Sequence, residues 1–216
     1  MHKIIPILLI AGAIACVKKA DTSPGADTVA ATTATTTATT TSSTAETPIA
    51  ATENAVAPEV NPPGDIPDSQ AFISYTNSAG GYQLDVPEGW ARSESGSSVT
   101  FVNKFDGVKV DVGVTAAKTK TAVEVRADEA KVLQAQGHAV SVTAVSDIKL
   151  PAGNAVVIKY TSNSEPNPVT NKKVRLENES YLFFRNGREA MLTLWAPKGA
   201  DNVDQWQRMS KSFRWK

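Results

Sequence analysis

The sequence has few of the residues from which metal sites and disulfide bonds are built. Its 216 residues include one cysteine, Cys16, and two histidines, His2 and His138. A single cysteine excludes an internal disulfide and any cysteine-rich zinc or iron–sulfur site. Two histidines exclude a metal site made of several imidazoles. We therefore expect neither a bound metal nor a cofactor.

An excess of charge of one sign is also absent. The 22 Lys and Arg residues are matched by 22 Asp and Glu residues, so the formal net charge at pH 7 is +0. Proteins that bind nucleic acid through bulk charge carry a positive excess, because the phosphate backbone is negative. The composition therefore argues against nucleic acid as a partner.

The apolar run near the N-terminus is too short to cross a membrane. It covers residues 4–14 and follows the basic start Met1-His2-Lys3. A membrane-spanning helix needs about 20 apolar residues. A basic start, a short apolar run and small residues before a cleavage point are the layout of a secretory signal peptide. We expect residues 1–15 to be removed from the mature protein.

The only cysteine follows this run directly. Residues Ala13-Ile14-Ala15-Cys16 resemble the lipobox of bacterial lipoproteins, although leucine is commoner than alanine three residues before the cysteine. The resemblance implies cleavage between Ala15 and Cys16 and attachment of a diacylglycerol to the Cys16 sulfur. An ordinary signal peptide with an unrelated cysteine is the alternative. Two or three acyl chains, palmitate among them, would hold the protein stably on a membrane.

The residues after Cys16 bear on which membrane would carry the anchor. Val17 and Lys18 stand where some enteric lipoproteins have the aspartate that retains them in the inner membrane. The lack of that aspartate somewhat favours the outer membrane in a cell that has two membranes. The lipobox therefore implies a protein of the bacterial cell envelope that meets the membrane through Cys16.

Residues 16–67 have the composition of a linker. They are rich in Thr, Ala and Pro and contain no aromatic residue, and residues 32–41 are all Thr or Ala. Such a segment buries too little apolar surface to offset the entropy of ordering the chain. We expect a disordered tether, which O-glycosylation of its threonines would modify without changing this role.

Residues 68–216 carry the patterns of a folded domain rich in strands. Apolar and polar residues alternate from Val108 to Ala116, which is typical of a half-buried strand. Turn signals separate the strands, and the strongest is Asn186-Gly187, the preferred pair of a two-residue hairpin. Successive hairpins predict a mostly antiparallel sheet.

Two segments predict helices that pack on this sheet. Thr121 and Glu124 form a capping box, and Gly137 marks the helix end. A second helix is expected to begin near Asp201. The apolar residues expected on the buried faces are Val123, Ala127, Ala130 and Leu133 in the first helix, and Val203, Trp206, Met209 and Phe213 in the second. The fold class is therefore α+β, an α/β/α sandwich.

Two short motifs resemble the PsbP/Mog-like fold. The strand at residues 82–86 leads into Pro87-Glu88-Gly89-Trp90, and the chain closes on a helix that ends in Ser212-Phe213. Members include the extrinsic photosystem II subunit PsbP, a Ran-binding nuclear-transport factor, and bacterial lipoproteins of the DcrB-like and LpqN-like types. The resemblance implies a binding or assembly module and no enzyme, and the lipobox favours the lipoprotein branch.

The sequence contains few groups of residues that could act together in catalysis. No Gly-x-Ser-x-Gly motif accompanies His138, whose place after Gly137 favours a structural or exposed histidine. Glu177 and Glu179 lie on one face of a strand, about 7 Å apart. A carboxylate pair can perform acid and base chemistry, so a lipid-anchored envelope hydrolase is the alternative function. An exposed strand face that simply carries charge explains the same pattern.

The loop at residues 163–173 is the expected binding surface. It is the longest polar insertion of the domain, and Lys172, Lys173 and Arg175 follow its prolines. Loops on a rigid scaffold often carry binding residues, and a basic patch would steer an acidic partner toward them. Trp90 is a second candidate for partner binding. The alternatives are a solvated basic strand face and a tryptophan of the core. The expected partner is an envelope protein of unknown identity.

Overall fold

The computed structural model describes residues 53–115 and 119–216. All of them belong to one compact unit, Pro48–Lys216. The expected signal peptide, Ala15, Cys16 and residues 17–52 lie outside the described residues, as do Ala116 and Ala117. No helix in the described ranges is long and apolar enough to cross a membrane.

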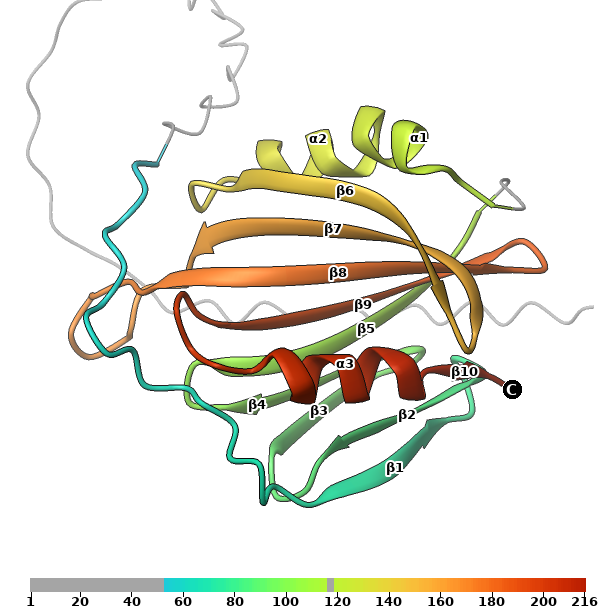
Figure 1. Cartoon of the computed structure of the whole chain (residues 1–216), viewed down its shortest axis with the longest axis horizontal. Coiled ribbons are helices and arrows are strands. Elements are labelled where there is room, and N and C mark those ends of the chain that lie inside the picture. Colours follow the sequence, from blue (N-terminus) through green and yellow to red (C-terminus); the bar gives the residue numbers. More distant parts are fainter. Residues whose placement is uncertain (1–52, 116–118) are drawn as a thin grey trace, which may run out of the picture. The chain divides into compact units, whose positions relative to one another are not determined.

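In the described part of the chain, ten strands form two antiparallel sheets (Figure 1). The smaller sheet has the order β1-β2-β10 and the larger has the order β3-β4-β5-β9-β8-β7-β6. The strands are β1 (Phe72–Asn77), β2 (Tyr82–Pro87), β3 (Ala91–Ser95), β4 (Ser98–Asn103), β5 (Asp106–Val114), β6 (Ser141–Leu150), β7 (Gly153–Asn163), β8 (Arg175–Arg185), β9 (Arg188–Pro197) and β10 (Arg214–Trp215).

The predicted hairpins are present. β8 and β9 turn at Asn186-Gly187, where φ is +50° and +74°. A two-residue hairpin turn of this kind needs positive φ at both positions, which asparagine and glycine adopt most readily. The turn brings Arg185 opposite Arg188 and sets the register along both strands.

The first predicted helix is present in two pieces, α1 (Ala122–Ala127) and α2 (Glu129–Ala135). The predicted capping box between Thr121 and Glu124 is present. The predicted buried face is wrong for Val123, which is 78% exposed, and for Ala127, which is also exposed. The chain breaks at Asp128, so α1 and α2 turn different faces to the sheet and Val125 is buried instead.

The last helix, α3 (Val203–Ser212), begins two residues after Asp201, near which it was expected to begin. Asn202, not Asp201, is its N-cap residue, and the Asn202 side chain does not cap the helix. Val203 is 63% exposed, so its prediction as a core residue is wrong. The rest of the predicted stripe is buried: Trp206, Met209 and Phe213.

The large sheet carries a hydrophobic core on each face. The main core lies between the large sheet, the small sheet and α3, and aromatic rings occupy its centre: Tyr82, Phe183 and Phe213, of which Phe213 stacks on both of the others. The second core lies under α1 and α2 and comprises Val125, Val156, Ile158, Tyr160 and Leu182. Helices and the small sheet therefore cover the two faces of one sheet, which is the predicted sandwich.

Residues 53–67, which we call the N-terminal strap, lie against the domain (Figure 1). Ile66 is 5% exposed and belongs to the main core. Its backbone N–H donates to Asn202 Oδ1 at 2.6 Å, and its carbonyl accepts from Gln205 Nε2 at 2.9 Å. This differs from the expected domain boundary at residue 68. The strap shows no apolar period in the sequence, and side chains at the start of α3, distant in sequence, satisfy the backbone groups of Ile66.

The first residue of β5 is a buried carboxyl beside the strap. Asp106 is 4% exposed, and its Oδ1 has no hydrogen-bond partner among the described residues. A side chain at Gly64 of the strap would lie 2.9 Å from that oxygen. Burial, with a smaller contribution from Asp65, raises the pKa of Asp106 to about 7. Asp106 therefore loses its proton near neutral pH, and the carboxylate that results is a buried charge that disfavours the folded state.

A chain that begins at Asp68 is expected to be less stable than one that begins at Glu53. The truncation exposes the core around Ile66, removes the strap partners of the Asn202 amide and leaves Gln205 with Asp68 as its remaining acceptor. We expect a loss of roughly 3 kcal/mol in the free energy of unfolding. Urea denaturation of both chains measures it, and equal midpoints would return the boundary to residue 68.

The stability of the domain is expected to fall as pH rises from 4 to 8. Folding raises the pKa of Asp106, so the stability that this group contributes is fully present below its unfolded pKa of 3.8. That contribution is lost as the pH rises through about 7. Asp106→Asn should flatten this pH dependence, which in the native sequence changes the free energy of unfolding by roughly 2 to 4 kcal/mol between about pH 4 and pH 8. Glu88→Gln, at an exposed turn, is the matched control; an unchanged slope in Asp106→Asn would refute the assignment.

Candidate functional site

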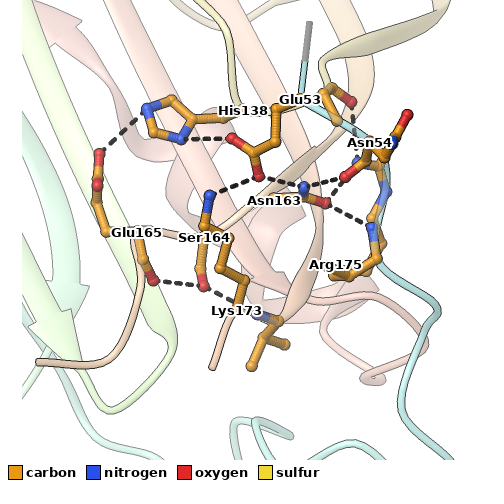
Figure 2. A network of polar contacts seen from close by, with 11 residues as sticks. Glu53, Asn54, His138, Asn163, Ser164, Glu165, Lys173 and Arg175 are labelled. Atoms are coloured by element: carbon orange, nitrogen blue, oxygen red, sulfur yellow. Dashed lines mark hydrogen bonds and ion pairs between the residues drawn. The ribbon is translucent and has the colours of Figure 1, made fainter. Parts of the chain in front are cut away.

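The expected binding loop connects β7 to β8 and meets two other segments at one end of the large sheet. These are the strap and the turn after α2, residues 136–140 (Figure 2). The backbone N–H of Asn163 donates to the His138 carbonyl at 2.6 Å, and that of Ser164 donates to the Val174 carbonyl at 2.8 Å. The loop is therefore closed at its base and anchored to the α2 turn.

The side chain of Asn163 joins these segments. It is 3% exposed and forms four hydrogen bonds. Nδ2 donates to Glu53 Oε1 at 2.5 Å and to the Asn54 carbonyl at 2.9 Å. Oδ1 accepts from Val56 N at 3.1 Å and from Arg175 Nη1 at 3.0 Å. All four hydrogen-bonding sites of the buried amide are used, which a buried polar group requires.

Arg175 supports the α2 turn and does not form part of an exposed basic face. It is 6% exposed, and its guanidinium donates to the Ala139 carbonyl at 2.9 Å and to Thr161 Oγ1 at 2.6 Å. The expectation that Arg175 meets a partner is therefore corrected. Its closeness to Lys172 and Lys173 in the sequence suggested a shared basic patch, but its side chain turns inward, where three acceptors compensate the buried charge. Burial lowers the pKa of Arg175.

Lys173 and Lys172 differ in their surroundings. Lys173 Nζ lies 2.8 Å from Glu53 Oε1, so its charge is already paired with the strap. The hydrogen bond from Asn163, followed by that from Lys173, lowers the pKa of Glu53. Lys172 is exposed and makes no ion pair with any described residue. Lys172 is therefore the cation of this patch that is available to a partner.

His138 lies between two carboxylates from different segments (Figure 2). Nδ1 is 3.7 Å from Glu53 Oε2 of the strap, and Nε2 is 3.2 Å from Glu165 Oε1 of the loop. His138 and Ala139 both have left-handed backbones, with φ of +57° and +47°. Such residues are costly without glycine and persist where surrounding contacts impose them, often beside functional sites. The Asn163 and Arg175 hydrogen bonds to this turn supply those contacts.

A pocket of about 590 Å³ opens beside this network, and we call it the α2 pocket. Its walls come from α2, the α2 turn, the loop and the β4–β5 turn, and its floor comes from β7, β8 and β9. Residues that line it include Val102, Lys104, Leu133, Gln136, His138, Tyr160, Ser162, Glu165, Pro166, Pro168, Asn178, Thr193 and Trp195. The sheet register places Trp195 opposite Gly107, a pairing that no local sequence pattern indicates.

The acid pair lies elsewhere, in a groove of about 680 Å³ between α3 and β6–β8. Glu177 and Glu179 both line it, as their strand spacing predicted. Lys159 Nζ lies 2.5 Å from Glu179 Oε1, and the Tyr181 hydroxyl donates to Glu179. Burial raises the pKa of Glu177, which forms no ion pair with a described residue. One carboxylate is therefore paired and the other is not.

Trp90 follows β2 and is partly buried against the main core. It lines neither the α2 pocket nor the groove that holds the acid pair. Its surroundings resemble those of a core residue at the sheet edge more than those of an exposed anchor. Across residues 53–115 and 119–216, no group of three or more His, Cys, Asp or Glu side chains is placed to hold a metal.

Comparison with protein-family models found no match, and neither did comparison with the curated proteins. Among solved structures, cyanobacterial PsbP (CyanoP) from Synechocystis sp. PCC 6803 superposes with a TM-score of 0.50 at 15% identity, covering 71% of this chain and 98% of that chain. A crystal structure from Bacteroides thetaiotaomicron VPI-5482 matches with a TM-score of 0.42 at 10% identity, over 66% of this chain and 48% of that chain. The likeness to CyanoP shows a PsbP-like fold, which confirms the predicted fold class.

Replacing Arg175 is expected to destabilise the domain. Arg175→Ala removes one of the two donors to Asn163 Oδ1 and the guanidinium donors to the Ala139 carbonyl and Thr161 Oγ1. The expected loss is roughly 2 to 4 kcal/mol in the free energy of unfolding, measured by urea denaturation. Lys172→Ala, an exposed cation three residues away, should change it by less than about 0.5 kcal/mol. Equal effects of the two changes would show that Arg175 is not a buried support.

Proposed function

We propose that this protein is a lipid-anchored lipoprotein of the bacterial cell envelope whose PsbP-like domain acts by binding and not by catalysis. The binding surface is the α2 pocket with the adjoining loop and Lys172. One observation carries the assignment: buried hydrogen bonds of Asn163 and Arg175 hold the α2 turn and the base of the loop as walls of that pocket. A binding site built on a supported scaffold loses little entropy when it is occupied.

The anchor in this proposal is Cys16, within the lipobox-like sequence that ends Ala15-Cys16. Acylation would tie the chain to the membrane, with the outer membrane somewhat favoured, and the PsbP-like domain would belong with the DcrB-like and LpqN-like lipoproteins. Because the strap is bound to the domain from Glu53 onward, residues 17–52 alone separate the anchor from the domain. The domain would then reach a shorter distance from the membrane than a linker ending at residue 67 allows.

The partner in this proposal is an envelope component that approaches the loop side of the domain. Lys172 supplies a positive charge beside the pocket, and Lys104 supplies another on the opposite wall. Such charges speed association with an acidic surface and matter less as salt rises. Lys173 contributes little, since Glu53 compensates its charge.

An envelope hydrolase that uses Glu177 and Glu179 is the second candidate function. Its support is the groove that both carboxylates line and the raised pKa of Glu177, which suits a proton donor. Against it, Lys159 and Tyr181 hold the Glu179 carboxylate. That arrangement satisfies the carboxylate as part of the fold, and it leaves Glu177 without a second catalytic group.

The anchor is tested by changing Cys16 to serine in the full chain expressed in a bacterium. We expect the protein to leave the membrane fraction and to lose the mass of its acyl chains, because the acceptor sulfur is gone. Ala13→Leu, which restores the commoner lipobox residue, is the matched control and should keep the protein at the membrane. Intact-mass measurement that finds an unmodified Cys16 in the membrane-bound native protein would overturn the proposed anchor.

A further inference from the structure

The floor of the α2 pocket presents a flat aromatic ring. Trp195 of β9 pairs with Gly107 of β5, and a side chain at Gly107 would come within 1.8 Å of Trp195 Cζ2. The indole therefore lies across β5 in space that only glycine leaves open. Trp195 stays partly exposed and lines the pocket. One ring face thus packs on the sheet while the remainder faces the pocket.

Beside this ring lies a row of neutral polar side chains. Asn178 is 7% exposed and lines the pocket, and its Nδ2 donates to Ser162 Oγ at 3.0 Å and to the Tyr160 carbonyl at 3.4 Å. The Asn178 Oδ1 atom has no hydrogen-bond partner among the described residues. Because Asn178 is more than nine-tenths buried, the pocket is where that acceptor meets a partner. Thr193, held 2.9 Å from the Ser180 hydroxyl, extends the row.

The charged groups of the pocket stand at its walls and are mostly neutralised. His138 and Glu165 face each other at 3.2 Å, and Lys104 at the β4–β5 turn is the only Lys or Arg among the lining residues. Pro166 of the loop and Leu133 of α2 add apolar surface above the floor. The interior therefore combines an aromatic platform, an unpartnered amide and hydroxyls, without a concentrated charge.

We propose that the α2 pocket binds a neutral saccharide, a proposal that rests on the function assigned to this pocket above. The apolar face of a pyranose ring stacks on Trp195, and its hydroxyl or acetamido groups hydrogen-bond to Asn178 and Thr193. The pocket volume of about 590 Å³ suits a ligand of a few rings. Lys104 is the only Lys or Arg among the residues that line the pocket, so a neutral sugar fits its interior better than a phosphate or a carboxylate.

A proline-rich peptide fits this pocket less well. Aromatic grooves that bind such peptides use tyrosine hydroxyls and tryptophan N–H groups as donors to peptide carbonyls. The Tyr160 hydroxyl is turned toward Ser180, and Tyr160 is 8% exposed. The row of groups available to a ligand is instead amide and hydroxyl, which matches the many hydroxyls of a sugar.

The test uses the full chain in a detergent without a sugar headgroup, with N-acetylglucosamine trimer and cellotriose as probes. Saturation-transfer NMR should show magnetisation passing from the protein to one face of a sugar ring, and isothermal titration should give a measurable Kd. Trp195→Ala should weaken binding about tenfold or more, and Asn178→Ala should weaken it several-fold, because stacking and one buried hydrogen bond are lost. Trp90→Ala, outside the pocket, should leave Kd unchanged.

The outcomes separate this proposal from the function on which it rests. The saccharide proposal is overturned if neither probe binds. It is also overturned if Trp195→Ala and Asn178→Ala leave the binding of the probes unchanged. Binding of a proline-rich peptide in place of both sugars assigns the same pocket to a peptide and also overturns it. If Trp195→Ala fails to fold, Asn178→Ala and the wild-type NMR contacts decide. Anchoring at Cys16 is measured separately, so its failure leaves this result intact.

Discussion

The fourfold-bonded amide of Asn163 is the interaction on which the functional end of the domain depends. Through it the end of β7 holds the strap, and with Arg175 it holds the turn after α2. A buried amide that uses all of its donors and acceptors fixes the geometry of its neighbours, since any displacement leaves a buried polar atom unpaired. The Asn163 backbone N–H donates to the His138 carbonyl and Arg175 donates to the Ala139 carbonyl, which explains how these two residues keep left-handed backbones without glycine.

The strap links the fold to the anchoring proposed for the N-terminus. Its contacts are made to residues more than 100 positions away, to Asn163 and Lys173 at one end and to Asn202 and Gln205 at the other. It also joins the main core to the pocket side, because Ile66 is buried at one end and Glu53 is paired at the other.

The groove beside α3 and the α2 pocket are lined by different kinds of side chain. The groove beside α3 holds charges that largely satisfy one another, with Glu179 between Lys159 and Tyr181. The α2 pocket is lined mainly by neutral groups, and the Asn178 Oδ1 acceptor there makes no hydrogen bond with a described residue. Such an acceptor is available to a ligand, whereas a carboxylate that is already paired is not. This difference, more than pocket size, favours binding at the α2 pocket.

The sequence by itself determined the hairpins and the capping box, because alternation, Asn-Gly turns and Thr121-to-Glu124 spacing are local rules of backbone geometry. The PsbP-like class was implied by the resemblance of two short motifs. It also pointed to the loop at residues 163–173 and to the spacing of Glu177 and Glu179. Only the tertiary structure decided that Arg175 is buried, that Ile66 belongs to the core and that Trp195 lies on Gly107. Each of these depends on partners far along the chain, and no local pattern encodes a contact between segments whose meeting depends on the register of a whole sheet.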